Sequence, residues 1–221
     1  MRIELHGIEL HGRHGALDWE RLLVVDRDPA CRVASDPHGS DAGHGAEVVL
    51  SEWTPFFRDY LATAAREGRE RDAIVPSPLM PNLMLDWLVA RARERWPGRL
   101  VETRPVGDVP GVPWQRASPD GSHYVSFAEW MCPINCIEPA RCPETRAARS
   151  WSLPPTVREF VAAERARGRP LFGPAIFHCR PRAFGVGMLD TADVVAGDGI
   201  VRDAGTSGPA DVLVGTTSHC H

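Results

Sequence analysis

Short apolar runs alternate with amphipathic helical segments over the first half of the chain, and this alternation restricts the folds open to it. The segments expected as strands are residues 21–26, 46–50, 73–76 and 99–103, and those expected as helices are residues 53–68 and 81–97. A strand, helix, strand order favours parallel strands joined by helical crossovers. Residues 1–105 are therefore expected to form an α/β domain with a mainly parallel open sheet.

The second half, residues 106–221, has a different character and carries most of the cysteines. A proline- and glycine-rich stretch opens it, and Thr156 and Glu159 indicate a capping box at the start of a helix that ends near Arg167. Strands are expected at residues 123–130, 175–178, 184–189 and 211–215. Whether this half is a separate domain or continues the first sheet is left open by the sequence.

Three cysteines lie within eleven residues of the second half. Cys132, Cys136 and Cys142 have the spacing C-x3-C-x5-C, and three thiols so close together make a soft chelating site for a thiophilic metal. In a reducing compartment, clustered cysteines are more often metal ligands or redox groups than disulfides. The alternative is a set of unpaired core thiols, which is the interpretation we favour for the isolated Cys31.

A closed metal site needs a fourth ligand. Cys179 is the first choice, because it follows an apolar strand and functional sites gather at strand ends in open sheets. Cys220 is the second choice. His178, His219 and His221 are further alternatives, since imidazole binds zinc and some iron–sulfur irons.

The spacing of the cysteines favours an iron–sulfur cluster over zinc. Zinc sites usually contain C-x2-C or C-x4-C pairs, whereas iron–sulfur loops vary more. The Cys132-Pro133 and Cys142-Pro143 steps resemble the Cys-Pro ending of bacterial ferredoxin loops, and the first interval matches the opening of the radical S-adenosylmethionine loop. The resemblance implies an iron–sulfur cofactor. A catalytic cysteine is a separate possibility, for which the spacing selects no nucleophile.

The segment from Leu22 to Pro29 resembles the second strand of Rossmann nucleotide-binding domains of the potassium-uptake regulator type. The resemblance implies that Asp26, at the strand end, binds the ribose of NAD or another nucleotide. The glycine fingerprint that should precede it is missing, since Gly7, Gly12 and Gly15 do not have its spacing. The simpler interpretation, which we favour, is that Asp26 ends a buried strand.

The charge balance gives no support for binding to nucleic acid or to an anionic membrane. The chain has 25 basic and 29 acidic residues and a net charge of -4. It contains no apolar run near the ~20 residues of a membrane span and no secretory signal at its start. These features predict a cytoplasmic protein.

Two functional hypotheses follow. The leading one is a cytoplasmic metal-binding protein that holds an iron–sulfur cluster or zinc through its clustered cysteines, with a role in electron transfer to a redox partner, redox sensing or stability. The alternative is a nucleotide-binding, Rossmann-like enzyme or sensor with a structural zinc site. The sequence identifies no catalytic acid–base pair, so enzymatic activity is left open, as are the metal, the substrate and the oligomeric state.

Overall fold

The computed structural model describes residues 21–31, 46–64, 66–76, 80, 82–133, 136–183 and 186–221. Within these residues the helices are α2 (Trp53–Ala64), the 3-10 turn η1 (Arg69–Arg71), α3 (Leu83–Arg95), α4 (Leu153–Ala166) and α5 (Thr191–Thr206). The strands are β1 (Leu22–Asp26), β2 (Ala46–Leu50), β3 (Ala73–Ile74), β4 (Trp114–Ala117), β5 (His123–Ser126), β6 (Leu171–His178), β7 (Arg180–Ala183), β8 (Val186–Asp190) and β9 (Asp211–Thr217). Gly7, Gly12 and Gly15, whose spacing does not match the nucleotide-binding fingerprint, lie outside the described residues.

The protein has the mixed α/β architecture expected from the sequence, but its described sheets are small, and they include both parallel and antiparallel pairs. Strands β1 and β2 form a parallel pair, as do β6 and β9, whereas β4–β5 and β3–β8–β7 are antiparallel. Two expectations for the first half were wrong in detail. Strand β3 pairs antiparallel with β8, and residues 99–103 form no strand. An apolar run fixes neither its direction nor its partner, because strand pairing is set by distant parts of the chain.

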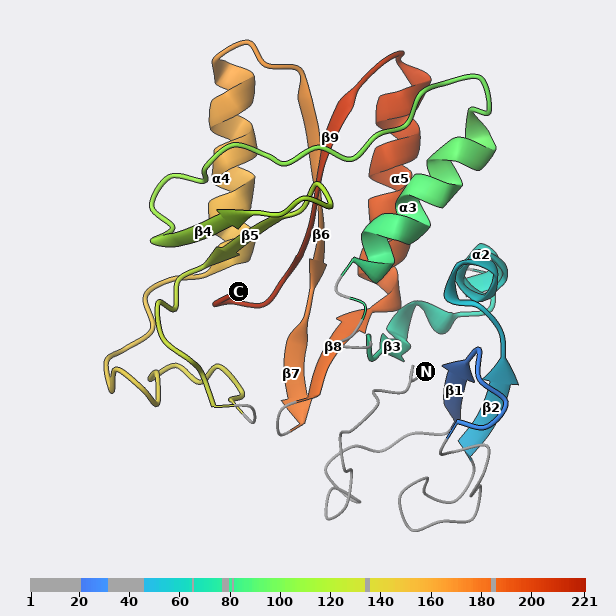
Figure 1. Ribbon diagram of the computed structural model, residues 1–221, viewed down its shortest axis with the longest axis horizontal. Coiled ribbons are helices and arrows are strands. Elements are labelled where there is room, and N and C mark those ends of the chain that lie inside the picture. The colour runs from blue at the N-terminus through green and yellow to red at the C-terminus, as the bar shows by residue number, and fades with distance from the viewer. Residues whose placement is uncertain are drawn as a thin grey trace.

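The parallel pair β6–β9 lies at the centre of the second half, with α4 and α5 on opposite sides of it (Figure 1). Helix α4 begins at Leu153, one turn before the expected capping box at Thr156 and Glu159. Two prolines occupy its first turn. Proline is tolerated there because the N–H groups of the first turn have no acceptor within the helix. The Thr156 hydroxyl donates to the Ser152 carbonyl at 2.9 Å instead of capping the helix.

Helix α5 was not predicted, and its glycines explain why. A glycine in a helix interior lowers helix propensity by about 1 kcal/mol relative to alanine, and α5 contains Gly197, Gly199 and Gly205. At Gly197 a Cβ atom would lie 2.8 Å from the Phe177 ring of β6, and at Gly205 it would lie 2.2 Å from the Trp96 ring. The glycines therefore permit close packing that a propensity scan cannot detect.

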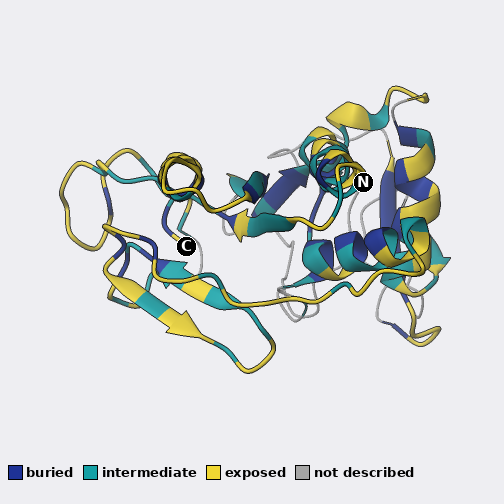
Figure 2. Ribbon diagram, turned by 90° about the horizontal axis from the view of Figure 1, so that it is seen from above, coloured by how far each residue is buried: buried dark blue, intermediate teal, exposed yellow. Residues whose placement is uncertain are grey.

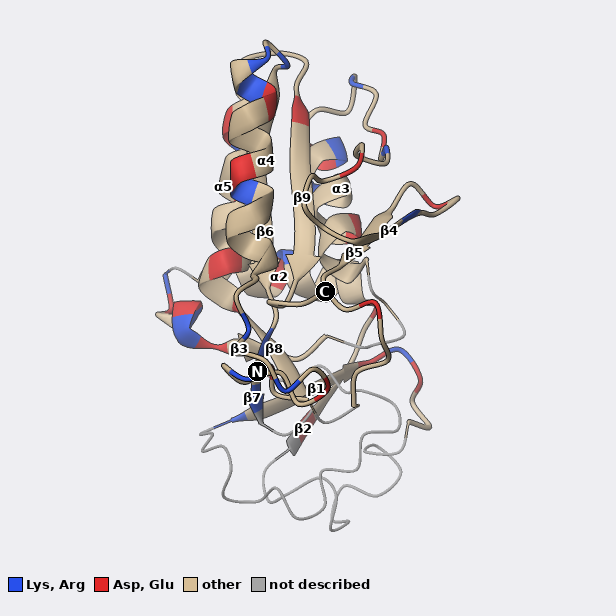
Figure 3. Cartoon of the chain, turned by 90° about the vertical axis from the view of Figure 1, so that its left-hand side faces the viewer, with Lys and Arg blue, Asp and Glu red and all other residues tan. Residues whose placement is uncertain are grey.

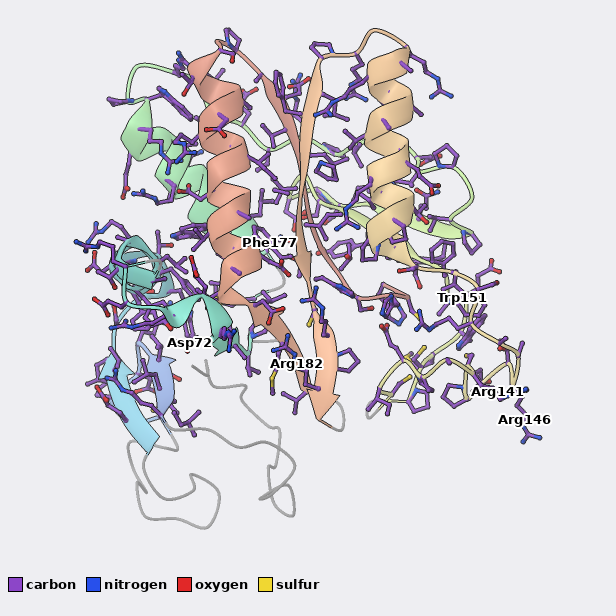
Figure 4. All side chains as sticks on the ribbon, turned by 180° about the vertical axis from the view of Figure 1, so that it is seen from behind. Asp72, Arg141, Arg146, Trp151, Phe177 and Arg182 are labelled. Carbon is purple, nitrogen blue, oxygen red and sulfur yellow. The ribbon has the colours of Figure 1, made fainter. Side chains whose placement is uncertain are left out.

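Two clusters of buried apolar side chains, besides a small one of Leu22 and Val24 in β1, form the core of the described part of the chain. The larger one joins both halves of the chain and comprises Leu23, Phe57, Tyr60, Leu61, Ile74, Leu83, Met84, Trp87, Leu88, Phe177, Leu189 and Val194. The smaller one packs α4 and β6 against the connection before β4 and comprises Val109, Val112, Leu153, Phe160, Val161 and Leu171. The Phe177 side chain, in β6, packs against α5 and is completely buried (Figure 4).

The surface differs from one part of the molecule to another. The hairpin β4–β5 is mostly intermediate or exposed, whereas buried residues gather around α2 and α3 (Figure 2). Basic and acidic residues are interspersed along α4 and α5 (Figure 3). No helix in the described part of the chain is both long enough and apolar enough to cross a membrane.

The close packing of α5 on β6 can be tested with two glycine substitutions. Gly197→Ala is expected to destabilise the fold by about 1–3 kcal/mol, because its Cβ would lie 2.8 Å from Phe177. Gly199→Ala is the matched control, expected to stabilise by about 0.5–1 kcal/mol, because its nearest neighbour, the end of the Arg202 side chain, is 3.9 Å away. Chemical denaturation measures both values, and equal effects would contradict the packing.

Candidate metal centre

The cysteine loop, residues 130–149, leaves the end of β5 and returns to the start of α4. An isolated antiparallel bridge joins Arg141 to Ala148 across it. The Arg146 N–H donates to the Cys142 carbonyl at 2.9 Å, and Arg146 itself takes a left-handed φ of 57°. Arg141 and Arg146 lie at the outer edge of the loop and point away from the molecule (Figure 4).

A second segment, Ser218–His221, follows β9 and reaches the loop from the other side. It lies at the carboxyl ends of the parallel strands β6 and β9, the edge where open α/β sheets bind ligands. The Phe127 N–H donates to the Cys220 carbonyl at 2.8 Å, and the Leu153 N–H donates to the His219 carbonyl at 2.9 Å. The hairpin and α4 therefore both fix the position of Cys220.

The loop and the 218–221 segment together line a partly open cavity of about 150 Å³. Four of the six cysteines, all of which lie within the described residues, line this cavity: Cys132, Cys136, Cys142 and Cys220. The other lining residues are mostly apolar or proline, with three charged groups and one histidine: Ala128, Trp130, Pro133, Glu138, Pro139, Pro143, Glu144, Arg149 and His221. The fold thus collects the three clustered thiols and the most distant cysteine around one space.

Hydrogen-bond donors point at the sulfur atoms. The Trp151 indole N–H donates to Cys220 Sγ at 3.3 Å, and the Glu138 backbone N–H donates to Cys136 Sγ at 3.4 Å. Trp151 lies on the inner side of the loop, next to α4 (Figure 4). Such donors stabilise a thiolate and are one of the ways in which proteins tune metal–thiolate centres.

The pKa values of the thiols reflect their crowding. Burial raises the pKa of Cys132, and the neighbouring Cys136 and Cys142 raise it further because like charges repel. Burial also raises the pKa of Cys220 to about 11, although the Trp151 N–H acts in the opposite direction. The pKa of Cys142 is lowered, chiefly by the Thr145 backbone N–H. A metal cation would reverse the burial effect, because a coordinating thiol is deprotonated outright.

The spacing of the thiols is wider than a single ion requires. Among the described residues, no three histidine, cysteine, aspartate or glutamate side chains come together closely enough to hold one metal ion. Around a single zinc ion, Zn–S distances of about 2.3 Å place the sulfur atoms roughly 4 Å apart. The four cysteines therefore share a cavity without converging on one point.

Cys179, our first choice for the fourth ligand, does not reach the cavity. Side chains alternate between the two faces of a strand, so Cys179 follows the direction of Phe177 and packs against the larger core cluster beside Gly187. Burial raises its pKa to about 11. The fourth thiol at the cavity is instead Cys220, the second choice.

Of the three histidines considered as alternative ligands, His221 alone lines the cavity. Its Nδ1 lies 3.0 Å from Ser126 Oγ. The rings of His178 and His219 pack edge to face with centroids 4.8 Å apart, and His219 Nδ1 lies 2.8 Å from Ser152 Oγ. Burial lowers the pKa of both rings. His178 and His219 therefore support the 218–221 segment and do not line the cavity.

Asp26, the residue assigned to nucleotide binding, ends β1 on the opposite side of the molecule from the cysteine loop (Figure 1). It is buried, and its Oδ1 accepts a hydrogen bond from the Asp28 N–H at 2.9 Å. This bond shapes the turn after the strand. The geometry accords with the simpler interpretation, in which Asp26 ends a buried strand.

Four cavity-side residues were missed by the sequence analysis: Trp130, Glu138, Arg149 and Trp151. The one available signal was the position of Glu138, the only carboxylate between Cys136 and Cys142. The Trp130 indole nitrogen is buried and has no partner at hydrogen-bond distance in the described part of the chain. Its N–H nevertheless lies near enough to Cys132 to lower the pKa of that thiol. It is therefore available to a sulfur acceptor in the cavity.

The Trp151–Cys220 hydrogen bond can be tested by Trp151→Phe, which removes the donor and keeps an aromatic ring. The pKa of Cys220, already about 11, is expected to rise further, because the N–H stabilises the thiolate. The pH midpoint of Cys220 alkylation in metal-free protein, followed by mass spectrometry, measures the change. Trp114→Phe, at an exposed position in β4, serves as the control, and an unchanged midpoint for Trp151→Phe would contradict the bond.

A family model described as AF_1314_C, uncharacterized protein, C-terminal domain, matches residues 84–221. This range is more than half of the chain and contains all four cavity cysteines. No curated protein and no solved structure matches the chain. The chain thus belongs to the AF_1314_C family through the part that builds the candidate metal centre.

Proposed function

We propose that the protein holds an iron–sulfur cluster of the [4Fe–4S] type through Cys132, Cys136, Cys142 and Cys220. The observation that carries this proposal is the cavity of about 150 Å³ lined by these four thiols. Four cysteine thiolates are the usual ligands of such clusters. Zinc would need the thiols to converge on one point, whereas a cube of iron and sulfide suits thiols that surround a larger space.

The chemistry of the walls supports the same choice. Soft thiolate ligands suit iron–sulfur clusters, and the N–H groups directed at Cys136 and Cys220 offset part of the charge that four thiolates bring. Arg149 adds a cation to the lining. The prolines and tryptophan of the walls keep the remaining surface apolar, which protects a cluster from water.

The position of the loop near the surface favours a redox role. We place this role in a reducing compartment such as the cytoplasm, where clustered cysteines are more often metal ligands or redox groups than disulfides. Met131, which directly precedes Cys132, is 92% exposed, and Ile137, which directly follows Cys136, is 44% exposed. Two of the ligands are thus adjacent to apolar surface residues. We propose that the centre exchanges electrons with a partner protein at this edge. A partner protein could not approach a deeply buried structural site in this way.

The proposal can be tested by comparing cysteine variants purified without oxygen. Cys136→Ser is expected to lose most of the iron, acid-labile sulfide and the broad visible absorbance near ~400 nm, since one of four ligands is removed. Cys179→Ala and Cys31→Ala are the controls, because both thiols lie outside the cavity lining. They are expected to retain wild-type iron.

Two results would contradict the proposal. The first is undiminished iron and sulfide in Cys136→Ser. The second is wild-type protein with one zinc ion per chain and no sulfide, which would point to a structural zinc site. If Cys179→Ala loses iron and Cys31→Ala does not, Cys179 and not Cys220 is the fourth ligand.

A further inference from the structure

Three of the proposed ligands come from one loop, but the fourth comes from a segment far away in the sequence. Cys220 is 82 residues from Glu138, so its place at the cavity depends on contacts that hold the 218–221 segment against the loop. Phe127 and Leu153 hold two carbonyl groups of this segment. Neither of them belongs to the cysteine loop, so neither links Cys220 to the other three ligands.

Glu138 provides that link. Its Oε2 accepts a hydrogen bond from the His219 N–H at 2.8 Å, and its Oε1 accepts one from the Cys220 N–H at 3.1 Å. The Ser218 hydroxyl donates to the same Oε1. Among the described residues, Glu138 is the only side chain of the 130–149 loop that is hydrogen-bonded to the backbone of this segment.

The backbone of Glu138 is arranged for this contact. Its φ is 50°, a left-handed conformation that is uncommon for residues other than glycine. Burial, the largest single influence, raises its pKa, but the hydrogen bonds from Ser218, His219 and Cys220 together outweigh burial and lower it. The side chain therefore carries its charge at neutral pH, and charge-assisted bonds to backbone N–H groups are stronger than neutral ones.

We propose that Glu138 is the positioning residue that fixes Cys220 as the permanent fourth ligand and so closes the centre to external ligands. This inference rests on the proposed iron–sulfur function. A cluster with all four corners held by the protein has no open iron for a substrate. The centre then serves electron exchange, and substrate activation at an iron atom is excluded as long as Glu138 holds the 218–221 segment.

The test compares the wild type with Glu138→Gln and Glu138→Ala. Glu144→Gln is the matched control, because Glu144 lines the same cavity and loses the same charge, while within the described residues its side chain has no hydrogen bond to the 218–221 segment. Cys220→Ser provides the reference for a missing fourth ligand. All variants are purified without oxygen, and circular dichroism checks that each is folded.

Three readouts separate positioning of the 218–221 segment from ligation of the cluster. Amide hydrogen exchange of the peptide after β9 is expected to be faster in both Glu138 variants and unchanged in Glu144→Gln, whether or not a metal is bound. After mild ferricyanide oxidation, the Glu138 variants and Cys220→Ser are expected to fall from about four to about three irons per cluster, with the paramagnetic signal of a three-iron form. Added 2-mercaptoethanol should change their visible spectra and leave the wild-type spectrum unaltered.

The outcomes distinguish this inference from the proposed function. Unchanged amide exchange in both Glu138 variants would overturn the positioning role, and so would cluster behaviour that matches Glu144→Gln. A spectral response of the wild type to 2-mercaptoethanol would overturn the closed centre. Wild-type protein without iron would overturn the proposed function, while the exchange measurement would still decide whether Glu138 holds the segment.

Discussion

The parallel pairing of β6 and β9 is the constraint on which the rest of the candidate site depends. The two strands pair from Leu171 opposite Asp211 to His178 opposite Thr217, with one register shift between Phe172 and Ala175, and both end at the same edge of the sheet. The residues after β9 therefore emerge beside the start of α4 and next to the cysteine loop. Without this register, Cys220 would be one more thiol distant from the other three.

Electrostatics then determines what the enclosed space can hold. Burial raises the pKa values of Cys132 and Cys220, and the neighbouring Cys136 and Cys142 raise that of Cys132 further. The fold opposes this effect with N–H donors aimed at sulfur, from Trp151 and from the loop backbone. Positive charge in the cavity would stabilise the thiolates further, and a metal cofactor would supply most of this positive charge.

The sequence predicted those parts of the site and fold that depend on local spacing. Cys132, Cys136 and Cys142 could be recognised because they are neighbours in the chain, and α2, α3 and α4 could be recognised by the period of their apolar residues. Helix α5 was missed because its contact positions are glycines, which carry no apolar pattern. The mainly parallel sheet was wrong in detail because the antiparallel pairing of β3 with β8 joins distant segments.

The fourth ligand and its support show the same limit. Cys179 and Cys220 both follow strands, and only the side-chain alternation along β6 shows that Cys179 turns toward the core. Glu138 gave little signal, because its partners lie about 80 residues away. Residues whose roles come from long-range contacts are visible only once the strands are paired.

The most direct test of the account is the iron and acid-labile sulfide content of the full chain purified without oxygen. A [4Fe–4S] centre in each chain predicts about four irons and about four sulfides per chain, together with a broad absorbance near ~400 nm. Zinc in place of iron, or a protein free of metal and colour, would contradict it.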